Sequence, residues 1–239
     1  MRLLSEILGR ARTENRTVLT EIESKQVLQE AGIECTETRL ARTRDEAISL
    51  SDAWGYPVVL KISSADITHK SDAGGVKVNL KNRAEVGAAY DGITRSARQK
   101  FPRARIEGIS VQRMARPGIE VIMGMPRDPS FGPVLMFGLG GVMVEVLQDV
   151  AFGIAPLEKN DAAEMIGGLK GKALLEGHRG QDPADKACLE NMLLGLSAFV
   201  ECRPEIAEID MNPVFARKDG AIVVDARIIL TNPAQPVQP

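Results

Sequence analysis

The pattern of apolar and polar positions in the first part of the chain predicts helices separated by a strand. Three polar residues are each followed three positions later by glutamate, the arrangement of a capping box, and they are Thr20, Thr43 and Asn82. This pattern predicts three helices, which end at Gly32, at Gly55 and near Gln99. Between the second and third helices, the β-branched run YPVVLKIS (residues 56–63) predicts a buried strand.

The pattern changes after residue 105, where short apolar runs are separated by glycine, proline and aspartate. These runs predict strands at residues 105–114, 118–125, 133–141 and 142–148. Two more helices are expected at residues 160–169 and 183–200, the second with Asp182 as its cap and Pro183 in its first turn. Two further strands are expected at residues 205–216 and 221–230.

A helix-rich first part and a strand-rich second part predict an α+β fold built from two α+β lobes. Ligands commonly bind in the crevice between such lobes. We expect an N-terminal helical arm at residues 1–19, the main domain at residues 20–230 and a disordered, proline-rich tail at residues 231–239.

Composition narrows the classes of function. The chain has 239 residues, a formal net charge of −2 and both signs of charge interspersed, so no basic stripe points to nucleic acid or to anionic lipid. No apolar run approaches the roughly 20 residues that span a bilayer. Three cysteines, Cys35, Cys188 and Cys202, are odd in number and lack the spacing of metal ligands. We therefore expect a cytoplasmic protein.

Three oxygen donors near the end of the chain predict a magnesium site. Asp210 and Asn212 are two positions apart on a predicted strand and therefore share a face. A hairpin turn centred on Asp219-Gly220 would set Val214 opposite Asp225 and bring Asp225 to that face. Such hard oxygen donors suit Mg²⁺. Alternatively, Asp225 only ends a strand, and a slip of one residue would turn it to the opposite face.

Two features in the first part of the chain suggest an anion. Lys61 is a charged residue within an apolar strand, and buried lysines are rare unless paired, although a lysine on an edge strand can also extend to water. His69 stands shortly before Gly74 and Gly75, whose backbone N–H groups can approach a phosphate closely. The glycine pair alone is equally consistent with a tight turn.

Lys61 and four longer segments form an ordered set: HKSDAGGVKVNL (69–80), GPVLMFGLGGVMVEVLQDVAFGIAPL (132–157), EIDMNP (208–213) and VDARI (224–228). Together they resemble the ATP-grasp domain of NDP-forming acyl-CoA synthetases. The resemblance is to the beta subunit of the ADP-forming acetyl-CoA synthetases, or to the equivalent C-terminal part of fused enzymes. It is more distant to the beta subunit of succinyl-CoA synthetases. It runs from about residue 20 to residue 230.

This resemblance implies an ATP-grasp fold, in which two α+β lobes hold ATP or ADP between them, with Mg²⁺ as cofactor. It implies that Lys61 contacts the nucleotide phosphates and that Gly74 and Gly75 form the loop over them. Gln112 and Met114 would lie at the adenine-binding hinge, and Glu120 would contact the nucleoside.

The resemblance also assigns Asp210, Asn212 and Asp225 to the magnesium cluster, in agreement with the register argument. His69 would be a histidine that carries a phosphoryl group. Imidazole suits such a relay because its ordinary pKa near 6.5 leaves it mostly neutral and nucleophilic at pH 7. The alternative is a loop histidine whose hydrogen bonds order Gly74 and Gly75.

Two positions differ from the family pattern. Gly153 replaces an arginine, which removes a positive charge near the expected phosphate site, and His178 replaces a tyrosine. Arg179 keeps its place and is a candidate for supplying the missing charge.

The chain has no room for a CoA-binding module, so we expect the nucleotide-handling beta subunit of an acyl-CoA synthetase, which needs a CoA-binding alpha partner. The acyl pocket would lie in that partner. The alternatives are a nucleotide-binding regulatory subunit with little turnover, suggested by Gly153, and a stand-alone ATP-grasp carboxylate–amine ligase. The 69–80 loop is not typical of those ligases.

Overall fold

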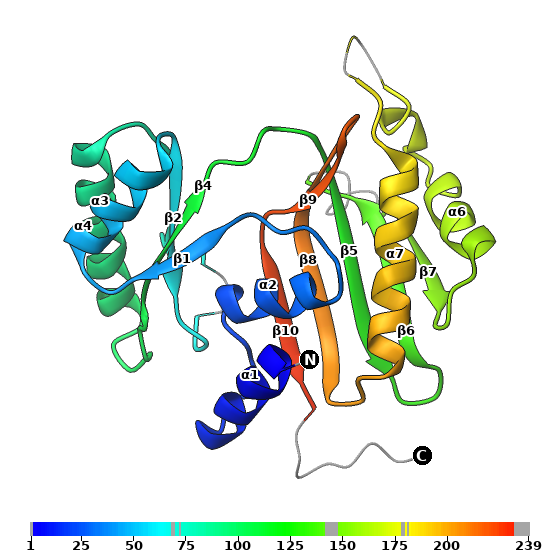
Figure 1. Ribbon diagram of the computed structural model, residues 1–239, viewed down its shortest axis with the longest axis horizontal. Helices are drawn as coiled ribbons and strands as arrows, with labels where there is room; N and C mark the ends of the chain where they lie inside the picture. The colour runs from blue at the N-terminus through cyan, green and yellow to red at the C-terminus, as the bar shows by residue number, and fades with distance from the viewer. Residues whose placement is uncertain are drawn as a thin grey trace. The chain divides into compact units, whose positions relative to one another are not determined.

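The computed structural model describes residues 2–67, 70–71, 73–141, 148–177, 180 and 182–231. The chain divides into two compact units (Figure 1). Unit 1 comprises residues 1–19, 23–35 and 116–239, and unit 2 comprises residues 20–22 and 36–115. Within the described ranges, no helix is long and apolar enough to cross a membrane.

Unit 2 is a four-stranded antiparallel sheet with helices on one face. Its strands are β1 (Thr38–Ala41), β2 (Val58–Ser63), β3 (Val76–Leu80) and β4 (Gly108–Arg113), in the order β1-β4-β2-β3. Helices α3 (Arg44–Trp54) and α4 (Arg83–Lys100) supply apolar side chains to a core with alternate residues of β2 and β4. Because strand residues alternate between faces, the intervening residues of β2 and β4 lie on the other face of the sheet.

The helix starts predicted in unit 2 are confirmed by their caps. The Glu46 N–H donates to Thr43 Oγ1 at 3.2 Å, and the Glu85 N–H donates to Asn82 Oδ1 at 3.0 Å. Gly55 ends α3 with a φ of 79°, a conformation that costs glycine little. These signals act within a few residues, so the sequence alone locates them.

Unit 1 is built on a six-stranded antiparallel sheet. Its strands are β5 (Ile119–Asp128), β6 (Gly132–Leu139), β7 (Val150–Ile154), β8 (Ile206–Arg217), β9 (Gly220–Val223) and β10 (Ala226–Leu230). The order is β10-β8-β5-β6-β7, with β9 also paired to β8. Its helices are α1 (Arg2–Thr13), α2 (Glu21–Glu30), α6 (Lys159–Gly167), α7 (Lys186–Glu201) and the short 3-10 helix η1 (Lys172–Leu174). The first two residues of α2 are assigned to unit 2.

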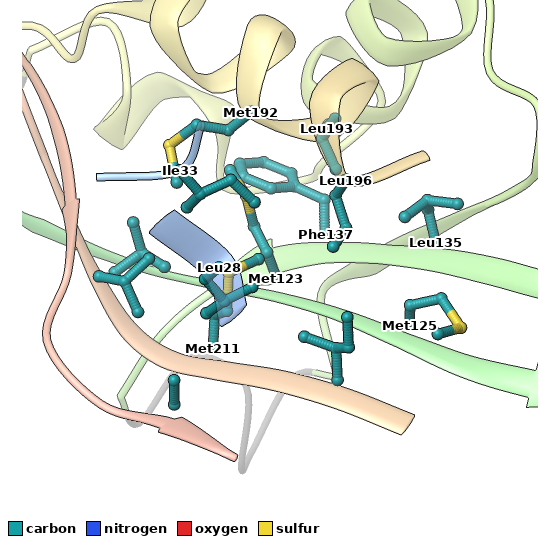
Figure 2. Packing of buried hydrophobic residues seen from close by; sticks show 14 of the residues in the cluster. Leu28, Ile33, Met123, Met125, Leu135, Phe137, Met192, Leu193, Leu196 and Met211 are labelled. Atoms are coloured by element: carbon teal, nitrogen blue, oxygen red, sulfur yellow. The ribbon is translucent and has the colours of Figure 1, made fainter. Parts of the chain in front are cut away.

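The core of unit 1 lies on one face of this sheet. Alternate residues of β5, namely Val121, Met123 and Met125, join it with side chains from α1, α2, α6 and α7. Figure 2 shows the ring of Phe137 on β6 close to Leu193 and Leu196 of α7. All three are fully buried. The intervening residues of β5 and β8 therefore lie on the opposite face, which we name the second face.

Several elements differ from the sequence prediction. Helix α7 begins at Lys186, where the Asp185 carboxylate accepts the Cys188 N–H at 2.9 Å, so the cap is Asp185 and the predicted Asp182 is wrong. The predicted strand at 221–230 is two strands, β9 and β10. Strands β1, β3 and β7 were not expected, and most of the strand predicted at 142–148 lies outside the described residues.

Candidate functional site

The face of the unit 2 sheet away from α3 and α4 carries two of the expected nucleotide-binding residues. In the β2–β4 register, Lys61 lies opposite Ser110 and Val59 opposite Gln112, so Lys61 and Gln112 share a face. Gln112 is fully buried. Met114, just beyond β4, is 39% exposed, and its N–H donates to the Pro57 carbonyl at 3.2 Å.

Lys61 is paired within unit 2. Its Nζ lies 2.7 Å from Glu21 Oε1, and both side chains are almost fully buried. The second oxygen of the same carboxylate, Oε2, lies 2.9 Å from Lys70 Nζ. The expectation that Lys61 is paired with an anion is therefore met by a carboxylate of the chain itself. Two cations converge on one buried carboxylate.

The glycine pair shapes a closed loop. The Gly74 N–H donates to the Ser71 carbonyl at 2.9 Å, and the Gly75 N–H donates to the Lys70 carbonyl at 2.8 Å. A side chain at Gly75 would place its Cβ 2.6 Å from Ile62. In this structure the two amides therefore hold the loop together, and their approach to a phosphate stays a prediction.

Glu120 lies on the second face of unit 1, beside a second glycine pair. The Gly140 N–H donates to the Glu120 carbonyl at 2.7 Å. A Cβ added to Gly140 would lie 3.0 Å from Glu120 Cβ, and one added to Gly141 would lie 3.3 Å from Glu120 Oε2. Gly140 and Gly141 thus leave room for the chain to pass directly over Glu120.

The three candidate magnesium ligands meet on adjacent strands. Arg227 of β10 pairs with Asp210 of β8 and Ala226 pairs with Met211, which places Asp225 opposite Asn212. The Asn212 N–H donates to the Asp225 carbonyl at 3.2 Å, as this register requires. The three residues are half-buried or exposed. They belong to the second face, away from α6 and α7.

The register that brings them together is not the predicted one. The hairpin turn is formed by Lys218-Asp219, so Val214 pairs with Val223, and the expectation that Val214 faces Asp225 is wrong. Val214 is fully buried in the core, where a carboxylate opposite it would be desolvated at high cost. An irregularity in the β5–β8 pairing lets Asn212 and Val214 serve opposite faces of the sheet.

The residues around this cluster fit a hard cation. Two carboxylates and one amide oxygen are the donor set that Mg²⁺ prefers, with substrate phosphates as further ligands. Arg227 lies 2.8 Å from Glu208 and 3.7 Å from Asp210, so it partly neutralises this acidic edge. Across the described residues, no group of three or more His, Cys, Asp and Glu side chains is arranged for a metal. The predicted set is of a different kind, because one of its three members is the amide of Asn212.

Asp219, proposed as a residue of the turn alone, has a second role. Its carboxylate lies 2.6 Å from Arg116 and 3.1 Å from Arg217. The hydrogen bond from Arg116, followed by that from Arg217, holds the pKa of Asp219 below its usual value. Both contacts are at the surface, where such pairs contribute little.

Gly153 points away from the second face. It pairs with the buried Leu135, and a Cβ added there would lie 2.7 Å from Leu157 and 2.9 Å from Met165 of α6. A side chain at position 153 would begin on the packed face of the sheet. The glycine that replaces the expected arginine therefore does not remove a charge from the acidic edge. This removes the reason for the regulatory alternative. His69, His178 and Arg179 lie outside the described residues.

A family model described as "ATP-grasp domain" matches residues 10–230. The chain belongs to the ATP-grasp family. It is 48% identical to the beta subunit of acetate–CoA ligase [ADP-forming] I from Pyrococcus furiosus, over 94% of this chain and 97% of that subunit.

Two further ATP-grasp relatives extend the comparison. Acetate–CoA ligase [ADP-forming] I from Archaeoglobus fulgidus is 46% identical over 85% of this chain but only 30% of its own length. A solved structure of acetyl-CoA synthetase 1 from Ca. Korarchaeum cryptofilum, in complex with coenzyme A and Ca-AMPCP, matches with a TM-score of 0.92 at 47% identity. It covers 95% of this chain and 99% of that one. In another structure of that synthetase, with Mg-AMPPCP, a phosphohistidine segment points towards the nucleotide binding site.

The candidate site includes two residues that the sequence analysis did not single out, Glu21 and Lys70. Glu21 is separated from Lys61 by 40 positions, and its role is visible only once the helix and the sheet have formed. Lys70 directly follows His69 in the sequence, and this position next to a candidate site residue could have identified it. The juxtaposition of Asp210, Asn212 and Asp225, by contrast, was predicted from the sequence, although through a register that the structure corrects.

Proposed function

We propose that this chain is the nucleotide-binding, phosphoryl-transferring subunit of an ADP-forming acid–CoA ligase, active together with a CoA-binding alpha partner. The reaction interconverts acyl-CoA, ADP and phosphate with carboxylate, ATP and CoA. The observation that carries the proposal is the end-to-end similarity to a separate beta subunit. A fused relative in which the similar region occupies 30% of the chain supports a partner that supplies the remainder.

In this proposal, residues of unit 2 contact the phosphates and the adenine of the nucleotide. Lys61 and Lys70 converge on one buried carboxylate and supply positive charge close to the 70–75 loop. Gly74 and Gly75 shape that loop. Gln112, on the same sheet face as Lys61, and Met114, just beyond that strand, contact the adenine.

In the same proposal, residues of unit 1 bind Mg²⁺ and contact the nucleoside. Asp210, Asn212 and Asp225 would hold Mg²⁺, which, when bound, neutralises the oxygens of the transferred phosphoryl group. Glu120 accepts hydrogen bonds from the nucleoside. This division supports phosphoryl transfer, because that chemistry depends mainly on positioning and charge neutralisation.

His69 is the proposed phosphoryl carrier. A ring nitrogen bonded to phosphorus passes the phosphoryl group to a terminal oxygen of ADP, which gives ATP and returns neutral imidazole. The neighbouring lysine at position 70, whose ammonium lies 2.9 Å from Glu21, supports an anionic group at this point of the chain.

Nucleotide binding tests the first half of the proposal. The pure chain should bind ADP with Mg²⁺ in a calorimeter and form no acyl-CoA, and addition of the CoA-binding subunit should restore acyl-CoA formation. Absence of any nucleotide affinity would refute the nucleotide assignment. Acyl-CoA formation by the pure chain would refute the need for a partner.

Phosphohistidine chemistry tests the second half. Labelled ATP with Mg²⁺, with the partner present, should give an acid-labile, base-stable phosphoprotein. His69→Asn should abolish the label and leave ADP affinity within a few-fold, because the lysines remain. His178→Asn is the matched control and should change neither. Retention of the label in His69→Asn would exclude this residue as the carrier.

A further inference from the structure

The carboxylate of Glu21 is an unusual element of unit 2. It is the first residue of α2, its side chain is about 4% exposed, and each of its oxygens faces a different ammonium group. Lys61 comes from strand β2, and Lys70 comes from the loop that follows this strand. Glu21 therefore connects strand β2 with the loop that follows it, through the two lysines that are proposed to contact the phosphates.

We infer that Glu21 is a positioning residue, which holds Lys61 and Lys70 together so that both ammonium groups face one phosphate. The inference rests on the proposed function. A lysine side chain has four rotatable bonds and much rotamer freedom, so a lysine that nothing holds is a poorly directed charge. A shared carboxylate fixes the two ammonium groups relative to each other.

The contact with Glu21 is compatible with phosphate binding. An ammonium group has three N–H donors, and a bond to one carboxylate oxygen uses one of them. Protein kinases provide an analogy, in which a helix glutamate holds the strand lysine that contacts the nucleotide phosphates.

The Lys70 contact also reaches the glycine loop. The Lys70 carbonyl accepts the Gly75 N–H at 2.8 Å, and the Gly75 carbonyl accepts the Ile62 N–H at 2.7 Å. Lys70 is thus tied to Glu21 by its side chain and to the β2 strand through Gly75. Loss of the Glu21 contact should loosen the Lys70 end of the loop without altering Gly74 or Gly75 themselves.

The deciding variant is Glu21→Asp, which keeps the negative charge but withdraws the carboxylate by one methylene. If Glu21 positions the lysines, Glu21→Asp should weaken Mg·ADP binding about 10-fold, and Glu21→Gln should weaken it at least as much. If Glu21 only neutralises charge, Glu21→Asp should bind ADP like the wild type. If Glu21 competes with the nucleotide for the lysines, both variants should bind ADP more tightly. Either of the last two results would overturn the inference.

A matched control is Glu23→Asp, which shortens a carboxylate of the same helix that is also almost fully buried but contacts Arg10 and Arg16. It should leave ADP affinity within two-fold. Competitive labelling with an amine reagent, read by mass spectrometry, supplies a measurement that needs no nucleotide. Lys61 and Lys70 should both label several-fold faster in Glu21→Asp than in wild type and in Glu23→Asp.

The two measurements separate the inference from the proposed function. If wild type fails to bind nucleotide while the labelling of Lys61 and Lys70 rises in Glu21→Asp, the proposed function fails and the positioning role stands. If wild type binds ADP but neither labelling nor affinity changes in Glu21→Asp, the positioning role fails and the proposed function stands.

Discussion

The two sheets of this protein carry opposite kinds of chemistry. In unit 2, the face away from the helices presents Lys61 and Gln112, which are buried, and the lysine is paired with a carboxylate of the chain. In unit 1, the second face presents Asp210, Asn212 and Asp225, which are half-buried or exposed. The cationic set is enclosed and the acidic set is accessible.

This difference has a physical reason. An uncompensated buried charge costs several kcal/mol, so a lysine inside a sheet layer needs a carboxylate in the folded protein. Ligands of Mg²⁺ must instead stay accessible, because this ion keeps several waters and binds through a few carboxylates and substrate phosphates. We therefore expect the two faces to differ in their dependence on metal, and the following experiments test that difference.

The largest effect is expected from the acidic face. Asp225→Asn should weaken ADP binding in the presence of Mg²⁺ by about 100-fold, at the upper end of what disturbing a metal site costs. In EDTA the variant should bind ADP as weakly as wild type does, because the missing ligand acts only through the ion. Calorimetry with and without Mg²⁺ measures both values.

Asp219→Asn is the control for that experiment. It removes a carboxylate from the hairpin that contains β8 and β9, where its contacts are to Arg116 and Arg217 at the surface. Its effect on ADP affinity should stay within two-fold. An equal loss in Asp219→Asn and Asp225→Asn would show that general charge, rather than a metal site, is responsible.

The next effect concerns the cationic face. Lys61→Met keeps an unbranched side chain that is one atom shorter and removes its charge. A hydrogen bond to a charged group contributes about 1.5–3 kcal/mol. ADP affinity should therefore fall about 10- to 100-fold, and the loss should be the same with Mg²⁺ and with EDTA. A loss seen only with Mg²⁺ would mean that both faces act through the metal and would break the comparison.

Local signals in the sequence located some of these elements correctly. The caps at Thr43 and Asn82 lie three residues from the amides they accept, so composition and spacing were sufficient. The juxtaposition of Asp210, Asn212 and Asp225 on adjacent strands was also predicted, but through an incorrect register. The turn is formed by Lys218-Asp219, one residue earlier than predicted, and Gly220, with a φ of 124°, closes it.

Other features depend on contacts that spacing cannot supply. Glu21 and Lys61 are 40 positions apart in the sequence, so spacing along the chain does not predict their contact. Gly153 lies on β7, a strand that was not predicted, and its orientation follows from its pairing with Leu135 of β6. The close passage of Gly140 and Gly141 over Glu120 became visible only in three dimensions.

Gly153→Arg tests whether the two faces of the unit 1 sheet act separately. Its first side-chain atom would lie within 3 Å of Leu157 and Met165, so the new side chain would overpack the junction with α6. We expect a loss of about 1–3 kcal/mol in the free energy of unfolding, measured by urea denaturation, with ADP affinity unchanged. A gain in ADP affinity would mean that the arginine reaches the acidic face after all.

The smallest expected effect concerns the cysteines of unit 1 and requires no mutation. Burial raises the pKa of Cys35 to about 12, whereas Cys202 is exposed. A maleimide reagent at pH 8 should therefore label Cys202 within minutes and leave Cys35 unlabelled until the chain is unfolded in urea. Because Cys35 ionises more readily in the unfolded chain, its contribution to stability is complete below pH 9 and declines as the pH rises towards 12. Labelling of Cys35 by the native protein at pH 8 would show that the packed face of unit 1 opens. In that case the packed face and the acidic face of unit 1 would differ only in how fast a reagent reaches them, and not in whether it reaches them.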